Sequence, residues 1–199
     1  MVSKFHQGAL KFGGAVFLQV LILLTLAWTP FMVEYKGEEV FIETVPVDPR
    51  HIFMGDYVDL RYTISELDLL NIDHDLDNWT GEHYGGSFPV YVVVAKKGIA
   101  HEAIGVYREK PVIAPEQVLL RGKISSFTYI PQWIVDEEKE MNIQPIHRIG
   151  IDYGLEHFYV PEGTGIYYED LIRNNQQVYG IAKVYQGRSV LVDLYVKKE

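Results

Sequence analysis

A long hydrophobic run near the start of the chain predicts a helix that crosses a membrane. Residues 13–33 contain no Lys, Arg, Asp, Glu or His, and at about 1.5 Å per residue they span about 31 Å, close to the thickness of a bilayer core. Lys4 and Lys11 precede the run, whereas Lys36, the first basic residue after it, is offset by neighbouring acids. The positive-inside rule then predicts three parts. These are a cytoplasmic N-terminus at residues 1–11, an anchor at 12–33 and an extracytoplasmic domain at 34–199.

A cleaved signal peptide is the alternative to a retained anchor. Its apolar region is usually about 7–15 residues long and ends in small residues before the cleavage site. The run here is longer, and Thr25-Leu26-Ala27 before Trp28 is a poor cleavage site. The pattern therefore favours an uncleaved, single-pass signal anchor in the cell membrane. Trp28 and Tyr35 suit its outer interface.

After the anchor, short stretches of alternating hydrophobic and polar residues predict a mainly β domain. The expected extended segments are residues 34–45, the stretch from Tyr57 to about Ser65, 90–94, 100–107, 118–125, 151–160, 178–184 and 189–196. Turns at Lys96–Gly98 and Gln186–Gly187 join two pairs of these strands into hairpins. Strands at such short spacing are typical of a barrel-like or sandwich fold.

Two polar stretches and one short helix complete the predicted domain. Residues 66–87 are polar and acidic, and residues 136–147 are charged and rich in turn formers, so we expect both to be loops. Thr164 suits the N-cap of a helix over about residues 166–174. The prediction is a mainly β extracytoplasmic domain with one short helix, plus one N-terminal transmembrane helix.

The order of the elements suggests that one β unit occurs twice. The hairpin over residues 90–107 resembles the hairpin over residues 178–195. A strand with an Asp-Tyr pair precedes each hairpin, at Asp56–Tyr57 and at Asp152–Tyr153. Duplication of an ancestral unit explains this order, and chance similarity between hairpins is the alternative.

The stretch from Gly55 to Tyr62 combines turn chemistry with the alternation of a strand. Glycine tolerates positive φ and aspartate can bond its own backbone, so Gly55–Asp56 suits a turn. The alternation that follows defines two faces. The expected core face holds Val58, Leu60, Tyr62 and Ile64, and the expected surface face holds Tyr57, Asp59, Arg61 and Thr63. As a large aromatic residue on the polar face, Tyr57 is expected either to pack against a loop or to contact a partner.

The same stretch fits the pattern G-D-Y-x-x-L-x-Y completely, and through it the chain resembles the GDYXXLXY family of bacterial membrane-anchored proteins. Two more blocks, Asp48–Arg50 and Tyr153–Gly163, resemble the family in the same order, and the resemblance covers roughly residues 45–195. It implies an anchored protein encoded beside multi-pass membrane proteins, and it implies no activity. The candidate site residues are Asp48, Arg50, Gly55, Asp56, Tyr57, Leu60, Tyr62, Tyr153, Gly154, Glu156, Pro161, Glu162 and Gly163.

The amino-acid composition is consistent with a well-packed domain, and the charge argues against some classes of binding partner. Hydrophobic residues make up 48% of the chain, and it contains 14 Tyr and no Cys. The lack of Cys excludes disulfides, thiolate metal sites and lipoprotein attachment. The net charge is −9, and the extracytoplasmic part is more negative still because Lys4 and Lys11 precede the anchor. This argues against nucleic acid and against an electrostatic hold on anionic lipid.

Three specific chemistries find weak support in the sequence. A Ser–Lys peptidase needs a serine soon after the anchor, but none lies between Ser3 and Ser65. The acidic stretch 68–77 invites a calcium interpretation, although the sixth and twelfth EF-hand positions counted from Asp73 are Asn78 and Tyr84. Paired carboxylates are the basis for a glycoside-type hydrolase. The acids available for it in the resembling blocks are Asp48, Asp56, Glu156 and Glu162.

We therefore expect a non-catalytic binding or assembly module that works with a multi-pass integral membrane protein. We expect no catalytic residues, cofactor or metal site. The alternative is an extracytoplasmic hydrolase that uses paired carboxylates. Two close acids in a cleft would favour the hydrolase, whereas a filled core with an apolar or aromatic surface patch would favour the binding module.

Overall fold

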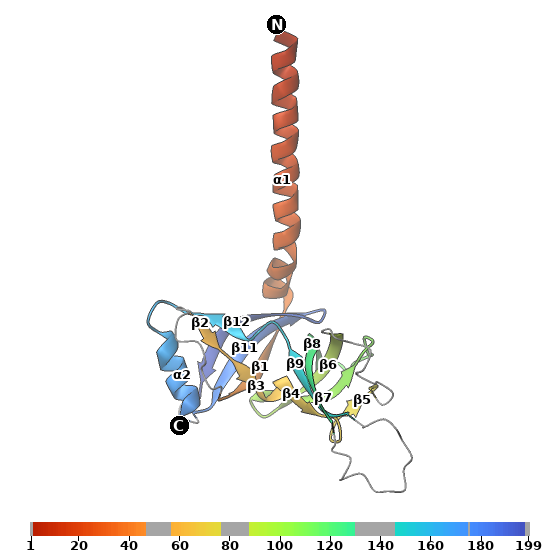
Figure 1. Ribbon diagram of the computed structural model, residues 1–199, viewed down its shortest axis with the longest axis vertical. Coiled ribbons are helices and arrows are strands. Elements are labelled where there is room, and N and C mark those ends of the chain that lie inside the picture. The colour runs from red at the N-terminus through yellow and green to blue at the C-terminus, as the bar shows by residue number, and fades with distance from the viewer. Residues whose placement is uncertain (1, 47–56, 77–87, 130–145, 175, 198–199) are drawn as a thin grey trace.

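A computed structural model describes one long helix, α1 (Val2–Lys36), that rises from a β domain and carries the N-terminus at its far end (Figure 1). The described residues are 2–46, 57–76, 88–129, 146–174 and 176–197. Within α1, the segment Lys11–Lys36 is long and apolar enough to cross a membrane, and almost none of it is buried. The last turns of α1 contact the β domain, where Val33 is buried.

The domain is mainly β with one short helix, as predicted. Its strands are β1 (Glu38–Val45), β2 (Tyr57–Asp59), β3 (Arg61–Tyr62), β4 (Glu66–Asp68), β5 (Asp73–His74), β6 (Phe88–Lys97), β7 (Ala100–Tyr107), β8 (Gln117–Tyr129), β9 (Ile146–Asp152), β10 (His157–Tyr159), β11 (Val178–Tyr185) and β12 (Arg188–Val196). A 3-10 turn, η1 (Thr63–Ser65), follows β3, and the helix α2 (Gly165–Arg173) lies between β10 and β11.

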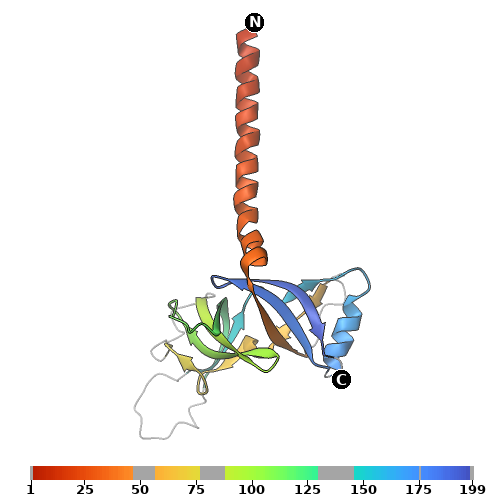
Figure 2. The same cartoon turned by 180° about the vertical axis from the view of Figure 1, so that it is seen from behind.

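Two curled sheets and a two-stranded ladder surround one core (Figures 1 and 2). One sheet has the order β12-β11-β1-β3, the other has the order β4-β9-β8-β6-β7-β5, and β10 pairs with β2. The core includes alternate residues of β1 and β6: Val40 and Ile42 of β1 and Val92 and Val94 of β6 are fully buried. The predicted hairpins are present as β6–β7 and β11–β12.

The motif stretch is not one strand to Ser65, as expected, but changes its pairing partner midway. β2 pairs with β10 and β3 pairs with β1. The change falls at Leu60, whose N–H donates to the Glu156 carbonyl at 2.7 Å. The two predicted faces are confirmed. Val58, Leu60, Tyr62 and Ile64 are buried, Tyr57 and Asp59 are partly exposed, and Arg61 and Thr63 are exposed.

Three other expected boundaries were wrong. Residues 34–36 still belong to α1, and β1 begins after them. The expected loop at residues 66–87 contains β4 and β5, because its apolar residues join the second sheet; residues 77–87 lie outside the described residues. The expected strand at 151–160 is broken between β9 and β10, where the chain crosses from one pairing partner to another. Of the predicted loop at 136–147, residues 136–145 are not described.

The cap of α2 also differs from the prediction. The helix begins at Gly165, but the Thr164 side chain makes no capping hydrogen bond to it. The Thr164 hydroxyl instead donates to the Pro161 carbonyl at 2.7 Å. The side chain therefore closes the turn before the helix rather than capping the helix.

The two hairpins have the same construction. β6–β7 turns through Gly98–Ile99, and β11–β12 turns through Gln186–Gly187. At the same distance from each turn the second strand carries one extra residue, Ile104 in β7 and Val192 in β12. Bulges are specific features of a strand pair, so their matched positions make the two hairpins structurally equivalent.

The strands around the hairpins repeat in the same way. β1 lies between β11 and β3, and β8 lies between β6 and β9. Val40 of β1 is opposite Ala182, and Val118 of β8 is opposite Val94, which are equivalent hairpin positions. The domain therefore consists of two equivalent halves, and the first strand of each half pairs with the hairpin of the other.

The centre of each half shows that the expected register of the repeat was wrong. β2 pairs with β10 in the same antiparallel register as β9 pairs with β4: Tyr57 is opposite Tyr159, and Arg148 is opposite Asp68. Residues 57–68 of the first half therefore correspond to residues 148–159 of the second. Tyr62, rather than Tyr57, is the equivalent of Tyr153. The two equivalent tyrosines are thus the two buried ones, and the similarity between the two Asp-Tyr sequence pairs does not mark equivalent positions.

Candidate functional site

The motif and the C-terminal block meet at the centre of the domain through two reciprocal hydrogen bonds. The Tyr62 hydroxyl donates to the Leu155 carbonyl at 2.6 Å, and the Tyr153 hydroxyl donates to the Ile64 carbonyl at 2.8 Å. Each acceptor lies two residues after the other tyrosine. The two tyrosines therefore hold equivalent places in an approximate two-fold relation between the halves.

Burial makes these two hydroxyls structural donors. Tyr62 and Tyr153 are both buried. Burial raises the pKa of each hydroxyl above its usual value, and the nearby Glu156 carboxylate adds to the rise. The neutral form is thus favoured near neutral pH, and a neutral hydroxyl can donate to a carbonyl.

The backbone N–H groups of the two tyrosines show the same two-fold relation between the halves. The Tyr62 N–H donates to Ser65 Oγ at 3.1 Å, and the Tyr153 N–H donates to Glu156 Oε1 at 2.5 Å. Ser65 and Glu156 are equivalent positions of the two halves. The structure thus brings Leu60, Tyr62, Tyr153 and Glu156 of the predicted site together, and they act as a framework between the halves.

The remaining part of the C-terminal block forms a local turn. The Thr164 N–H donates to the Pro161 carbonyl at 3.0 Å. Gly163 has a φ of 81°, which suits glycine at the third position of such a turn. Glu162 is exposed in this turn and does not line either pocket described below. The block therefore sets the path of the chain into α2.

Four predicted site residues and part of the acidic stretch are not placed. Asp48, Arg50, Gly55 and Asp56 lie outside the described residues. In the described part of the acidic stretch, Asp75 accepts the Arg108 N–H at 2.9 Å. No group of three or more His, Asp or Glu side chains among the described residues is arranged to hold a metal ion.

Tyr57 belongs to a surface patch of aromatic and apolar side chains. Its ring lies edge-on to His157 with 5.2 Å between centroids, and 6.1 Å from the ring of Tyr159. Tyr159 is 78% exposed, and Ile166 and Tyr167 of α2 are also mostly exposed. The start of α2 lies against β2, since a Cβ at Gly165 would be 3.7 Å from the Tyr57 carbonyl oxygen. We call the exposed and partly exposed side chains on these neighbouring elements, Tyr57, Tyr159, Ile166 and Tyr167, the aromatic patch. The loop from β10 to α2 lies on the side of the domain from which α1 rises (Figures 1 and 2).

Replacing Tyr57 by alanine is expected to cost only about 1–2 kcal/mol of unfolding free energy, because its ring makes aromatic contacts at a partly exposed site. Denaturant unfolding of the full chain in mild detergent would measure the cost. A loss as large as that of a buried tyrosine would show that Tyr57 is a core residue. Its assignment to a contact surface would then be wrong.

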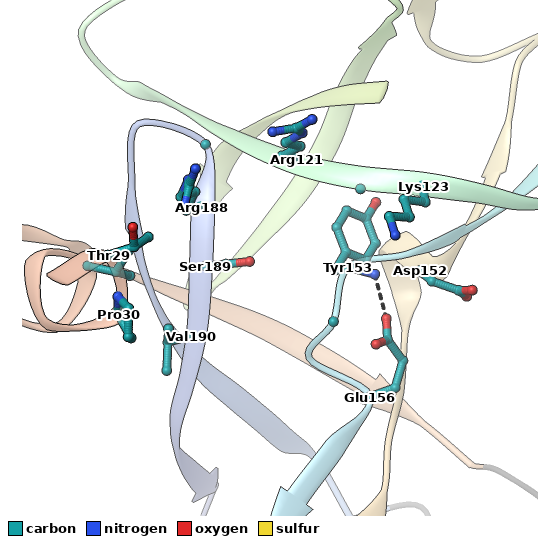
Figure 3. A pocket seen from close by; sticks show the side chains of 14 residues that line it. Thr29, Pro30, Arg121, Lys123, Asp152, Tyr153, Glu156, Arg188, Ser189 and Val190 are labelled. Carbon is teal, nitrogen blue, oxygen red and sulfur yellow. Dashed lines mark hydrogen bonds between the residues drawn. The ribbon is translucent and has the colours of Figure 1, made fainter. Parts of the chain in front are cut away.

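A pocket of about 650 Å³ lies in the corner between α1 and the β domain (Figure 3). Thr29, Pro30 and Val33 of α1 form one wall, and β8, the chain after β9 and the β11–β12 turn form the rest. Three basic side chains line it, and we call them the basic triad: Arg121, Lys123 and Arg188. Two acids, Asp152 and Glu156, line it as well.

Sequence reasoning missed most of this pocket. Tyr153, Gly154 and Glu156 were in the predicted site, but the basic triad and the α1 residues were not. The triad comes from β8 and from the start of β12, which are far apart in the chain. The contact that joins them is the Arg121 N–H, which donates to the Gly187 carbonyl at 2.8 Å. No local pattern predicts such a contact.

His101 is a buried histidine held in its neutral form. Its Nδ1 accepts the Phe41 N–H at 3.1 Å. Burial lowers the pKa of His101 below its usual value of 6.5, and acceptance of a hydrogen bond requires an unprotonated Nδ1. His101 joins β7 to β1 and thereby links the two sheets.

Acidification should therefore weaken the fold through His101. Because the folded pKa is lowered, the contribution of His101 is complete above about pH 6.5 and declines as the pH falls from there towards the folded pKa. The thermal midpoint of the full chain should fall between pH 7.5 and pH 5, and less steeply in His101→Gln. His6→Gln, in the N-terminal part of α1, is the control and should keep the wild-type slope. Equal slopes for wild type and His101→Gln would contradict this.

The structure is that of a mainly β protein with an N-terminal helix of transmembrane length. Leu60 and Tyr62 of the G-D-Y-x-x-L-x-Y motif lie at the centre of its β domain. The family model of the GDYXXLXY protein matches residues 19–194, so the chain belongs to the GDYXXLXY family. No curated protein and no solved structure shows significant similarity to it.

Proposed function

We propose that this protein is a non-catalytic binding or assembly module, anchored by α1, whose extracytoplasmic β domain docks on a multi-pass membrane protein. The observation that carries the proposal is the aromatic patch. Exposed apolar patches rimmed by polar residues mark interaction sites, and Tyr is enriched in interfaces between proteins. The patch begins in the GDYXXLXY motif and extends to α2.

The junction between α1 and the domain supports this role because it fixes the direction in which the patch faces. The Gly37 N–H donates to the Val33 carbonyl at 2.8 Å, and Lys183 Nζ donates to the Glu34 carbonyl at 2.9 Å. A Cβ at Gly37 would lie 2.2 Å from the Val33 carbonyl oxygen, so the chain needs glycine there. A domain held in this way presents the same surface to a neighbour of α1 in the bilayer.

The orientation of the anchor belongs to the proposal too. Lys4 and Lys11 precede the apolar segment and favour a cytoplasmic N-terminus. α1 continues without a break to Lys36, and Val33 is buried against the domain. The unbroken run of the helix from the apolar segment to the domain supports a retained, uncleaved anchor.

The hydrolase alternative has less support among the described residues. Asp59 is paired with His157 Nδ1 at 2.8 Å, and Asp152 accepts from the Ser125 hydroxyl at 3.1 Å. Glu156 accepts the Tyr153 N–H. These three acids line a smaller cavity of about 280 Å³, but each already serves a structural contact. A paired-acid mechanism needs carboxyl groups free to exchange protons with a substrate.

Co-purification from detergent-solubilised membranes tests the proposal. The full chain should bring down one multi-pass membrane protein in stoichiometric amount. The variant Ile166→Ser/Tyr167→Ser should lose it, because the change removes exposed apolar area without touching the core. The control Leu70→Ser/Val112→Ser changes two residues that are at least as exposed elsewhere on the domain and should retain the partner. Equal capture by both variants would contradict the proposal.

A further inference from the structure

We propose that the pocket beside α1 binds the phosphate of an anionic phospholipid in the outer leaflet of the membrane that α1 crosses. The inference rests on the proposed placement of α1 in the bilayer. It adds a lipid site to a protein whose overall negative charge opposes any general attraction to anionic membranes.

The first support is the charge of the pocket. Arg121 and Lys123 come from the same strand, β8, and Arg188 lies beside them at the start of β12 (Figure 3). None of the three forms an ion pair with a described residue. Guanidinium groups match phosphate oxygens in two-point contacts, and an ammonium adds a third donor. The basic triad is therefore suited to a phosphate anion.

The second support is that the two acids among the described pocket residues form no ion pair with the triad. Asp152 is the cross-strand neighbour of Lys123, but its carboxylate accepts from the Ser125 hydroxyl and points away from Lys123 (Figure 3). Glu156 accepts the Tyr153 N–H. The pocket lining therefore has three cations against two carboxylates, a net positive charge of one, and the donors of the triad are not taken up by these acids.

The third support comes from comparing the two halves of the domain. The same backbone positions occur twice, so the other half shows what the fold itself requires there. The equivalents of Arg121, Lys123 and Arg188 are Glu43, Val45 and Ala100. The fold therefore does not need basic residues at these positions. They are present only in the copy whose pocket has α1 as a wall.

The fourth support is the depth of the pocket relative to the bilayer. Trp28, Phe31 and Tyr35 are exposed on α1 at the level of the wall residues Thr29 and Val33. Aromatic side chains of this kind mark the headgroup region of a membrane. The triad then lies at the height of lipid phosphates. The acyl chains of the same lipid can run along the exposed apolar side of α1, so the observations favour a membrane lipid over a free phosphate compound.

Lipid retention by the purified full chain tests the inference without any partner protein. The chain in mild detergent is mixed with equal amounts of phosphatidylglycerol and phosphatidylcholine and re-isolated, and the retained lipids are quantified by mass spectrometry. The wild type should enrich phosphatidylglycerol about tenfold or more, because each cation near an anionic headgroup contributes roughly a factor of five. Because no partner is present, this result is independent of the co-purification experiment.

Two variants with the same change in charge make the test specific. Arg121→Gln/Lys123→Gln/Arg188→Gln should reduce the enrichment to near one. The control Lys96→Gln/Lys97→Gln/Lys110→Gln removes three exposed cations outside the pocket and should preserve it. If the triad variant melts below the wild type, Arg188→Gln alone, at an exposed turn, should still lose about fivefold. Equal enrichment by the wild type and the triad variant, or equal loss by the control, would overturn the site.

A soluble phosphate ester separates the two sources of the anion. Glycerol 1-phosphate, titrated into the full chain by calorimetry, should bind at least about tenfold more weakly than phosphatidylglycerol, because it lacks the acyl chains that α1 would contact. Binding of glycerol 1-phosphate as tight as that of the lipid, and lost in the triad variant, would show a site for a free phosphate compound. That outcome would overturn the assignment to a lipid.

Discussion

Replacing Tyr62 by alanine is expected to lower the free energy of unfolding by about 3–5 kcal/mol, the range found when large aromatic residues in cores are truncated. Tyr62 is 2% exposed. Its ring is closely enclosed, since a Cβ at Gly180 would lie 2.8 Å from Tyr62 Cε1. The substitution would leave both a cavity and an unpaired Leu155 carbonyl. Denaturant unfolding of the full chain in mild detergent measures the loss.

Tyr62→Phe is the control that separates packing from hydrogen bonding. It keeps the ring and removes the donor to the Leu155 carbonyl, so it should cost about 1–3 kcal/mol, as expected for a buried acceptor left without its partner. A loss in Tyr62→Ala no larger than that in Tyr57→Ala would contradict the assignment of the two residues to opposite faces of the motif strand.

Replacing Tyr153 by alanine is expected to produce a loss in the same range, about 3–5 kcal/mol. The reason is its equivalence to Tyr62: the residue is also buried, and its hydroxyl also donates to a carbonyl of the other half. The same unfolding measurement applies. A loss below about 1 kcal/mol, the value typical of an average substitution, would contradict the two-fold relation between the halves.

The double variant Tyr62→Phe/Tyr153→Phe tests the relation in another way. The two hydrogen bonds link the same two segments, so their effects should not be independent. We expect the loss in the double variant to differ from the sum of the two single losses. Strict additivity would indicate that the two contacts act separately.

Local patterns were sufficient to predict much of the fold. The faces of the motif strand and both hairpins follow from alternation and from short turns, which involve only neighbouring residues. Long-range pairing was harder to predict. Nothing near Leu60 reveals that its N–H binds the Glu156 carbonyl and ends one ladder. The register of the repeat was missed for a similar reason. The two Asp-Tyr pairs resemble each other in sequence, but the equivalent residues are the buried tyrosines Tyr62 and Tyr153, and their equivalence is visible only in the strand pairing.

The candidate site was predicted only in part. The motif and the C-terminal block that resembles the family identified Tyr62 and Tyr153, but the role of these residues is to join the halves of the domain. The aromatic patch was partly foreseen, because Tyr57 stood out as a large residue on a polar face. The basic triad could not be foreseen, because its members meet only when the β11–β12 turn is placed against β8.

Photo-cross-linking in intact membranes tests the central claim most directly. A photoreactive residue is placed at Tyr167 in the aromatic patch, at Leu24 on the exposed side of α1, and at the fully exposed Val112 as a control. The proposal predicts that the probes at Tyr167 and Leu24 give adducts with one and the same multi-pass membrane protein, and that the probe at Val112 gives none. If the probe at Tyr167 forms no protein adduct, the docking function is contradicted.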